Sequence, residues 1–578
     1  MIVGDARRGI CGALFFCSLA LFAHSSLVFA QPVHGQRYIV KVASGQPAHG
    51  LFLQAVRTAN LSAVAQEVDE NIPGSKTIYK ASKFGMLVVE SDNDDGLLED
   101  ALSRHPYVKY FEKDVEFRID AVDPGSGISY PAPSGNVLSP WMRDVLGMTG
   151  SDMPASDLSP TGTPTIVAII DTGAMVTHPY LKTGILKNTG EYGKTANTDN
   201  DSNGVKNDVY GASFTADANG NLVVSGDPSD IGTDHGTHVA GIVKTIRDQA
   251  IATEGGVYAG AAQNVVILPI RFINESQVGS TSGAIAALDY AARRGAKVVN
   301  CSWGARGEDA FTQALFDAMA EAYTQHDMLI TIAAGNAERS GPNNNDTVPY
   351  FPSSFNIPSV LSVASVTPEY TAGGKTGGTL FDDPLSDFSN YGANTVHLAA
   401  PGGYRDKDGY SEGIYSANAR FIDSGGSDYV KKKGTSMATP VVAGVAGVVR
   451  AINPTLTSYE VKKLLLDTVA RKTYLKNAVS SSGIVNAAAA YAAALDASTT
   501  GAKPAVPDKP YLTYNQPVSA TSSSGSGGGG GCGALQNVGS VPPGNGLLGG
   551  NSLMLFSAIY LFSVFVKSMR RHIKKRRV

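Results

Sequence analysis

The feature that most constrains the fold is an alternation of short apolar segments and helical stretches between residues 140 and 495. The apolar segments are rich in β-branched residues and carry no polar face. Strands of this kind need cover on both faces, as in a parallel sheet between two layers of helices. The predicted strands are 165–170, 265–269, 297–301, 328–334 and 360–366, and the predicted helices are 279–294, 309–326 and 437–452. The region is therefore predicted to be an α/β domain.

Three motifs stand where such a sheet binds its ligands, at strand ends and helix starts. Asp171-Thr-Gly ends an apolar strand, Asp-His235-Gly-Thr-His238 leads into a helix, and Gly-Thr-Ser436-Met-Ala-Thr-Pro opens another. Each has an ordinary structural explanation by itself, such as a strand-end carboxylate, a packed histidine or a helix N-cap. The two histidines do not form the His-Glu-x-x-His pattern of metalloproteases, and Gly-x-Ser-x-Gly is absent.

Taken together, the motifs follow the chain order Asp, His, Ser of the subtilisin-type triad. They resemble the signatures of the subtilisin-like serine protease (subtilase) family. The segments 298–304, 333–336, 351–354, 388–392 and 399–402 agree with this resemblance. It implies a subtilisin-like parallel sheet with helices on both faces.

The resemblance also implies catalytic roles. Ser436 would be the nucleophile, His235 its general base, and Asp171 the group that orients the imidazole. Asn336 matches the asparagine of the family's oxyanion hole. No cofactor is implied for the chemistry itself.

Two further segments match the family's substrate-binding walls, whose backbone holds an extended substrate as an added strand. The implied substrate-binding residues are Ser302, Trp303, Gly304, Ala333, Ala334 and Gly335. A second wall is expected near Gly279 and Ser280. Neither matched segment contains an acidic residue, so we expect an apolar or broad preference. Basic specificity is the alternative, because Glu338 lies just past the second segment. Cys301 is predicted to be a buried, inert thiol, and sensitivity to thiol reagents is the alternative.

One segment between the Asp and His motifs predicts a calcium loop. Oxygen-bearing residues stand at alternate positions from Asp199, with Gly204 sixth. The Glu that closes an EF-hand at the twelfth position is replaced by Tyr210. The segment resembles a calcium-binding loop of many subtilases, and the alternative is an Asx-rich surface turn. The predicted ligands are Asp199, Asp201, Asn203, Val205 and Asp208.

Residues 31–120 are predicted to form a small α+β, ferredoxin-like domain. Strands are expected at 37–42, 86–90 and 108–117, and helices at 51–70 and 97–104. The pattern resembles the family's inhibitory propeptide, whose last strand enters the active-site cleft as a substrate would. Residues 121–139 would be the processing linker. The alternative is a small binding domain that is retained.

The two ends of the chain predict export. Residues 1–30 have the charged start, apolar middle and small-residue end of a signal peptide, with an uncleaved anchor as the alternative. Residues 496–550 are predicted to be a flexible linker, 551–566 a transmembrane segment and 567–578 a basic cytoplasmic tail. A short interfacial helix is the alternative to the span. The catalytic domain would then lie outside the cytoplasm, in the cell envelope.

The tail also resembles bacterial C-terminal sorting signals, in which a membrane protease cuts the tail and passes the protein to the surface or medium. Cys532 follows a run of five glycines there. It could mark the processing point or be a lone linker thiol.

Composition narrows the function classes. With 43% hydrophobic and 17% charged residues, the chain is neither disordered throughout nor a coiled coil. The last twelve residues carry seven Lys/Arg and no acid, so the net charge of −4 leaves −4 − 7 = −11 for the rest, which disfavours nucleic-acid binding. The predicted function is an exported serine endopeptidase, made as a self-processing zymogen, that cuts proteins or peptides. The alternatives are a catalytically silent surface binding protein and a narrow-specificity processing protease of exported proteins.

Overall fold

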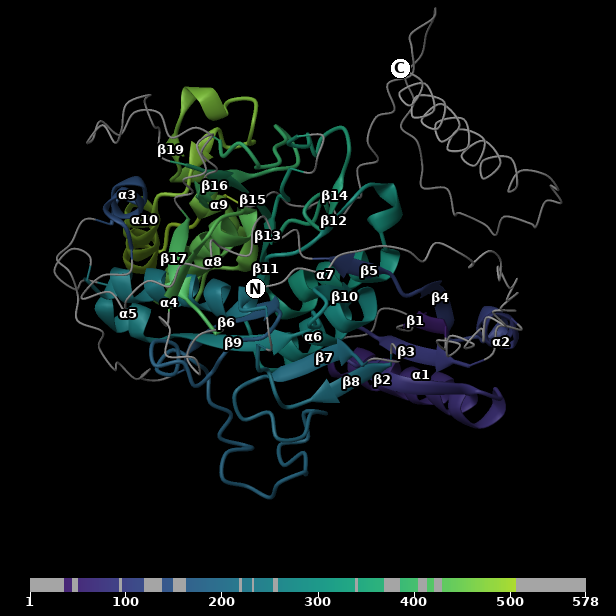
Figure 1. The fold of residues 1–578 in the computed structure, drawn as a ribbon. Coiled ribbons are helices and arrows are strands. Elements are labelled where there is room, and N and C mark those ends of the chain that lie inside the picture. Colours follow the sequence, from purple (N-terminus) through teal and green to yellow (C-terminus); the bar gives the residue numbers. More distant parts are fainter. Residues whose placement is uncertain are drawn as a thin grey trace, which may run out of the picture. The chain divides into compact units, whose positions relative to one another are not determined.

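The structure is a computed structural model (Figure 1). It describes residues 36–43, 50–92, 96–118, 138–148, 163–217, 221–230, 233–252, 258–337, 341–367, 385–403, 413–419 and 429–505. The predicted signal peptide, membrane span and basic tail lie outside the described residues. So do the predicted processing linker up to residue 137 and the glycine-rich linker from residue 506 onward.

The N-terminal part is a four-stranded antiparallel sheet with two helices on one face. Its strand order is β2-β3-β1-β4, from β1 (Gln36–Val42), β2 (Ser75–Ala81), β3 (Met86–Ser91) and β4 (Val108–Lys113). The helices are α1 (Gly50–Asn71) and α2 (Leu97–Arg104). Alternate residues of β1 face opposite sides, as strand geometry requires. Val40 packs in the core beneath the helices, whereas Ile39 joins the core of the larger domain.

The second part is built on a ten-stranded sheet of order β19-β20-β16-β15-β13-β11-β6-β9-β7-β8. Neighbours from β20 to β7 pair in parallel, and the pairs at the two edges are antiparallel. The bounds are β6 (Thr165–Asp171), β7 (Ala212–Ala216), β8 (Leu222–Ser225), β9 (Val265–Arg271), β11 (Val298–Cys301), β13 (Leu329–Ala333), β15 (Val360–Val366), β16 (Leu398–Pro401), β19 (Ala470–Arg471) and β20 (Gly483–Ile484). The predicted α/β class is confirmed.

Helices cover both faces of this sheet (Figure 1). Along β6, Ile166, Ala168 and Ile170 pack with α6 (Thr281–Arg293) and α7 (Gln313–His326). Val167 and Ile169 pack on the opposite side. The helices of that side are α4 (His235–Ala252), α5 (Ala259–Gln263), α8 (Thr435–Ile452), α9 (Ser458–Asp467) and α10 (Ala487–Thr500), with the short α3 (Pro140–Val145) beside them.

Shorter elements complete the domain. Three two-stranded pairs join β5 (Glu116–Arg118) to β10 (Val278–Ser280), β12 (Ala305–Arg306) to β14 (Tyr350–Phe351), and β17 (Ile414–Ala417) to β18 (Tyr429–Lys432). The 3-10 helices are η2 (Glu308–Ala310) and η4 (Thr473–Leu475).

Three predicted helix starts differ from the structure by two residues or more. The helix expected from residue 437 begins at Thr435. The helix expected from residue 279 begins at Thr281, because Gly279 is in β10 and the Ser280 side chain caps the helix by accepting the Gly283 N–H at 3.1 Å. The helix expected from residue 309 begins at Gln313, because η2 and two extended residues, Phe311 and Thr312, precede it.

Helix α8 crosses the centre of the molecule and packs closely on its neighbours. A Cβ on Gly444 would lie 2.8 Å from Ile246 of α4, and one on Gly447 would lie 2.8 Å from Val167 of β6. Among the described residues, α8 is the helix long and apolar enough to cross a membrane, and 89% of it is buried inside the fold. It is therefore a core helix.

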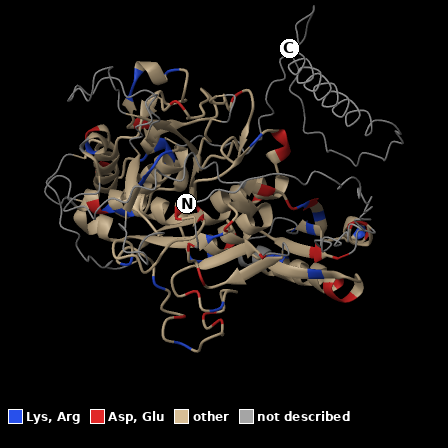
Figure 2. Cartoon of the chain, in the orientation of Figure 1, with Lys and Arg blue, Asp and Glu red and all other residues tan. Residues whose placement is uncertain are grey.

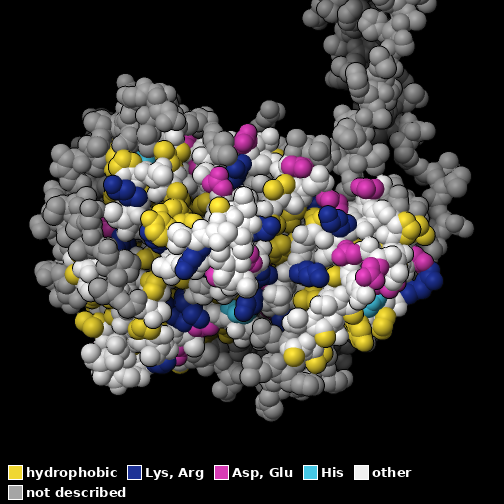
Figure 3. All heavy atoms as spheres, turned by 90° about the horizontal axis from the view of Figure 1, so that it is seen from below, with side chains coloured by type: hydrophobic (Ala, Val, Ile, Leu, Met, Phe, Trp, Pro, Cys, Tyr) yellow, Lys and Arg dark blue, Asp and Glu magenta, His cyan; other side chains and the backbone are white. Residues whose placement is uncertain are grey.

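Charged residues are spread over the periphery and are scarce on the central strands (Figure 2). The loop between β6 and β7 carries charges of both signs. On the face seen from below, basic and acidic side chains are interspersed rather than gathered by sign (Figure 3).

Candidate active site

The ends of β6 and the start of α4 bring Asp171 and His235 together. His235 Nδ1 lies 2.7 Å from Asp171 Oδ1, which also accepts the Thr172 N–H at 2.7 Å. Asp171 is fully buried. A Cβ on Gly236 would lie 2.1 Å from the Gly173 carbonyl oxygen, so only glycine lets the histidine approach the strand end this closely. The Asp171 carboxylate is therefore placed to fix the His235 tautomer with the proton on Nδ1.

Ser436 lies in the first turn of α8, and its backbone meets the loop after β11. Its hydroxyl donates to the Ser302 carbonyl at 3.2 Å, and the Ser302 hydroxyl donates to the Ser436 carbonyl at 3.0 Å. His235 Nε2 has no hydrogen-bond partner among the described residues. The Ser436 hydroxyl is thus bonded to Ser302 rather than to the imidazole. Catalytic hydrogen bonds are often loose without substrate.

Asn336 follows β13 and is anchored to the same helix start. Its Oδ1 accepts the Thr435 N–H at 2.9 Å and the Thr435 hydroxyl at 3.1 Å. Because the oxygen is taken up in this way, the amide nitrogen is the part of Asn336 that can donate to a ligand. The start of α8 also has a partial positive charge from the helix dipole.

The six predicted substrate-binding residues lie around these groups. Trp303 Nε1 donates to the Ile170 carbonyl at 2.8 Å, which fixes the indole beneath the end of β6. A Cβ on Gly304 would lie 2.4 Å from Tyr350, and one on Gly335 would lie 2.5 Å from Asn390. Ser302, Ala333 and Ala334 are buried. Both glycines are therefore required for close packing of this wall.

An aromatic residue that the sequence analysis missed occupies the same region. Phe117 is fully buried, and its ring centroid lies 5.5 Å from that of Trp303, which itself lies 4.7 Å from that of Phe272. Phe117 is opposite Gly279 in the antiparallel pair of β5 and β10. The last strand before residue 119 thus lies against the expected second wall. The signal in the sequence that could have identified Phe117 was its position as an aromatic residue at the end of the predicted strand 108–117.

Cys301 and His238 are structural. Cys301 is fully buried, and burial raises the pKa of its thiol well above the ordinary value. His238 Nε2 faces the carbonyls of Ile414 at 2.9 Å and Val430 at 3.1 Å, and burial followed by the charge of Lys432 lowers its pKa well below 6.5.

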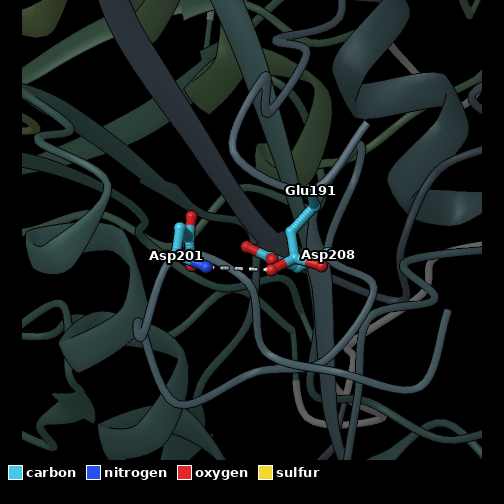
Figure 4. Close-up of side chains that lie close together, drawn as sticks. All are labelled: Glu191, Asp201 and Asp208. Atoms are coloured by element: carbon cyan, nitrogen blue, oxygen red, sulfur yellow. Dashed lines mark hydrogen bonds between the residues drawn. The ribbon is translucent and has the colours of Figure 1, made fainter. Parts of the chain in front are cut away.

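The loop between β6 and β7 brings two of the five predicted calcium ligands, Asp201 and Asp208, close together. Carboxylate oxygens of Glu191, Asp201 and Asp208 lie within 4.8 Å of one another (Figure 4). The Asp199 carboxylate instead accepts the backbone N–H groups of Asn203 and Gly204.

The carboxylate set fits a hard cation, which takes oxygen ligands. Arg294 Nη1 lies 3.2 Å from Asp201 and supplies a counter-charge at the cluster. Glu191, eight residues before Asp199, was missed because it lies outside the alternating pattern.

Comparisons with known proteins agree with the family that the sequence motifs indicate. The family described as Peptidase_S8, Subtilase family, matches residues 162–497. "Subtilisin-like protease 1" of Plasmodium vivax is 29% identical over 343 residues, which cover 57% of this chain and 48% of that protein. "Extracellular protease" of Xanthomonas campestris pv. campestris is 29% identical over 346 residues, covering 58% and 52%. The chain thus spans about half the length of these two relatives.

A solved structure shares the fold. The epidermin leader peptide processing serine protease (EpiP) of Staphylococcus aureus superposes with a TM-score of 0.51 at 20% identity, covering 79% of this chain and 97% of that one. The family match extends over more than half of the chain and includes all three motifs. The chain therefore belongs to the subtilase family, the subtilisin-like serine proteases.

Proposed function

We propose that this chain is an exported serine endopeptidase that uses Asp171, His235 and Ser436 as its triad and is made as a self-processing zymogen. The observation that carries the proposal is the 2.7 Å contact between His235 Nδ1 and Asp171 Oδ1. That contact leaves His235 Nε2 as the acceptor for a proton. The expected substrates are proteins or peptides that bind as an added strand.

The first chemical step begins with a rotation of Ser436. Its hydroxyl leaves the Ser302 carbonyl and turns to His235 Nε2, which takes the proton as the oxygen attacks the scissile carbonyl. The imidazolium is stabilised by Asp171 and returns the proton to the leaving amine. Water then hydrolyses the acyl-enzyme, with His235 again acting as base.

The oxyanion of each tetrahedral intermediate would be held at the start of α8. The donors are the Ser436 backbone N–H and the Asn336 side-chain amide, which is oriented by its bonds to Thr435. Fixed donors of this kind stabilise charge as it develops, without reorganisation.

The zymogen part of the proposal is supported by the way residues 36–118 dock. Strand β5 pairs antiparallel with β10, and Phe117 is buried against Trp303. Such a segment would occupy part of the substrate-binding cleft in the way that an extended substrate does. A bond beyond residue 118 would then be cut by the enzyme itself.

Two acidic side chains of the docked unit lie at helix starts of the larger domain. Glu112 accepts the N–H groups of Gln313 and Ala314 at 3.1 and 3.0 Å at the start of α7. Asp114 accepts the Ser282 N–H at 2.8 Å at the start of α6. Carboxylates at helix N-termini are stabilised by the free N–H groups and the helix dipole, which supports a specific, removable inhibitor.

Three further parts rest on sequence patterns or on the loop geometry. Calcium would be a structural ion held by Glu191, Asp201 and Asp208, contributing charge neutralisation to the loop. Export would follow from the signal peptide, and anchoring from the C-terminal span. A relative called "Extracellular protease" is in keeping with export.

The test is intact mass over time for the wild type and Ser436→Ala, with labelling by a serine-directed inhibitor. We expect the wild type to lose its N-terminal unit and to take the label at Ser436, while the variant does neither. If both stay whole, folded and unlabelled, a catalytically silent binding protein replaces the proposal. Digestion of casein would count against a narrow processing protease.

A further inference from the structure

A buried ion pair joins the segments that lead into His235 and Ser436. Lys432 Nζ forms a short contact with Asp234 Oδ1. Asp234 directly precedes His235, and Lys432 stands four residues before Ser436. Asp234 is 2% exposed and Lys432 is 6% exposed. Two charges are thus held out of water beside the candidate triad.

The backbone of Asp234 adds a second observation. Its φ is +54°, in the left-handed region that non-glycine residues seldom adopt. Aspartate and asparagine tolerate this region better than other side chains. The surroundings therefore hold the residue in an uncommon conformation just before His235.

The β17–β18 hairpin carries Lys432 and rests on the first turn of α4. The Ile414 and Val430 carbonyls accept the His238 Nε2–H, and the Ser416 hydroxyl donates to the His238 carbonyl at 2.7 Å. Strand β18 then runs through Gly434 into α8. The hairpin therefore contacts the histidine's helix and leads directly into the serine's helix.

We propose that Asp234 and Lys432 are positioning residues for the proteolytic reaction, holding the loop of His235 against the loop of Ser436 and keeping the local charge balanced. The proposal rests on the triad proposed above. Neither residue touches a reacting atom, and both act through His235 and Ser436.

The charged and titratable groups around His235 define what the pair contributes. Asp171 contacts the imidazole at 2.7 Å, and Cys301 interacts electrostatically with Asp171. Asp230 interacts with Asp171 and bonds to Thr237. His238 interacts with both Lys432 and His235. Removal of either member of the pair leaves one uncompensated charge in the segment that leads into His235.

The test is the pH dependence of kcat/KM for Asp234→Asn, Lys432→Met and the double variant. Asparagine is also tolerated at positive φ, so Asp234→Asn removes the charge while keeping the backbone. It leaves Lys432 unpaired, which disfavours the imidazolium and moves the acid limb to lower pH. Lys432→Met leaves Asp234 unpaired and moves the limb to higher pH. Each shift should be roughly half a pH unit or more.

The double variant and a matched control separate positioning from general stability. Asp234→Asn/Lys432→Met should return the limb to the wild-type pH while kcat stays reduced about fivefold or more and KM is unchanged, because the tie between the loops is lost. Lys244→Met removes another buried lysine, which pairs with the partly exposed Asp248 within α4. It should leave the limb in place.

Each rate is divided by the concentration of sites that the serine-directed inhibitor labels. Unfolded molecules, which are not labelled, therefore do not contribute to the calculated rate. The proposal is overturned if the acid limb of the kcat/KM profile is unchanged in both single variants, or if it moves in the same direction in both. If a single variant does not fold, a double variant with unchanged kcat overturns it. A wild type that takes no serine-directed label refutes the triad and the pair together, whereas a labelled, active wild type with unmoved limbs refutes the pair alone.

Discussion

At the scale of single residues, the site depends on how each polar group is occupied. Asn336 has its oxygen bound to Thr435, which fixes the orientation of its side-chain amide. The Ser436 hydroxyl donates to the Ser302 carbonyl, so the proposed reaction requires this hydroxyl to rotate. Cys301, one residue before Ser302, is sealed in the core. The residue types alone do not show how these three side chains are placed. Their hydrogen bonds and their burial do.

Asn336→Leu should lower kcat by roughly 10²- to 10³-fold with little change in KM, because the lost donor acts on the transition state. The replacement has a similar size and cannot donate. Steady-state kinetics on a peptide ester or amide would measure this. A fall confined to KM would show that Asn336 binds substrate rather than the oxyanion.

Cys301 should not react with thiol reagents in the folded protein. Its thiol is fully buried, and burial raises its pKa, so almost no thiolate is exposed at neutral pH. Peptide mapping after alkylation under native conditions and in denaturant would measure the difference. Native modification of Cys301 would favour the reagent-sensitive alternative.

At the scale of elements, helix starts organise the contacts between the N-terminal unit and the larger domain. Glu112 and Asp114 lie at the starts of α7 and α6, and Tyr79 donates to the buried Asp289 of α6 at 3.0 Å. Lys41 pairs with Glu321 of α7 at 2.5 Å. The same two helices therefore cover the sheet with one face and receive the smaller unit with the other.

Glu112→Gln should shorten the delay between cleavage of the chain and the appearance of activity. A neutral amide keeps the size but gives up the charge at the α7 N-terminus, which is worth on the order of 1 kcal/mol. Glu67→Gln is the matched control, because Glu67 bonds to Asn71 within α1. Equal delays in wild type and Glu112→Gln would show that this contact does not govern release.

At the scale of the whole molecule, one buried basic pair sets an expected pH dependence of stability. Lys462 of α9 lies 2.8 Å from His397 Nε2 and donates to the Val360 carbonyl. No carboxylate of the described residues lies within 4.0 Å of Lys462. Burial lowers the pKa of Lys462 from 10.5 to about 7, and burial followed by Lys462 lowers that of His397 well below 6.5.

Stability should therefore fall as pH drops from about 10.5 to 7. In that window the unfolded chain binds a proton at Lys462 that the folded chain does not, at a cost on the order of 1 kcal/mol per pH unit from this group. Below pH 7 both forms are protonated at Lys462, and the loss from His397 begins below 6.5.

Denaturant unfolding at pH 7.5 and 9.5 would measure the effect. Lys462→Met should flatten the dependence, whereas Lys463→Met, at the half-exposed neighbouring position, should retain it. An unchanged slope in Lys462→Met would contradict the neutral lysine.

The sequence by itself determined the α/β class, the five adjacent strands β6, β9, β11, β13 and β15 of the large sheet, and the positions of Asp171 at a strand end and His235 at a helix start. Apolar periodicity is local, and parallel topology brings strand ends to one edge. Only the tertiary structure decided that Glu191 joins the acidic cluster, that Phe117 packs on Trp303, and that Lys432 pairs with Asp234. Those partners are brought together by the path of the chain and by close packing, which leave no periodic signal among neighbouring residues.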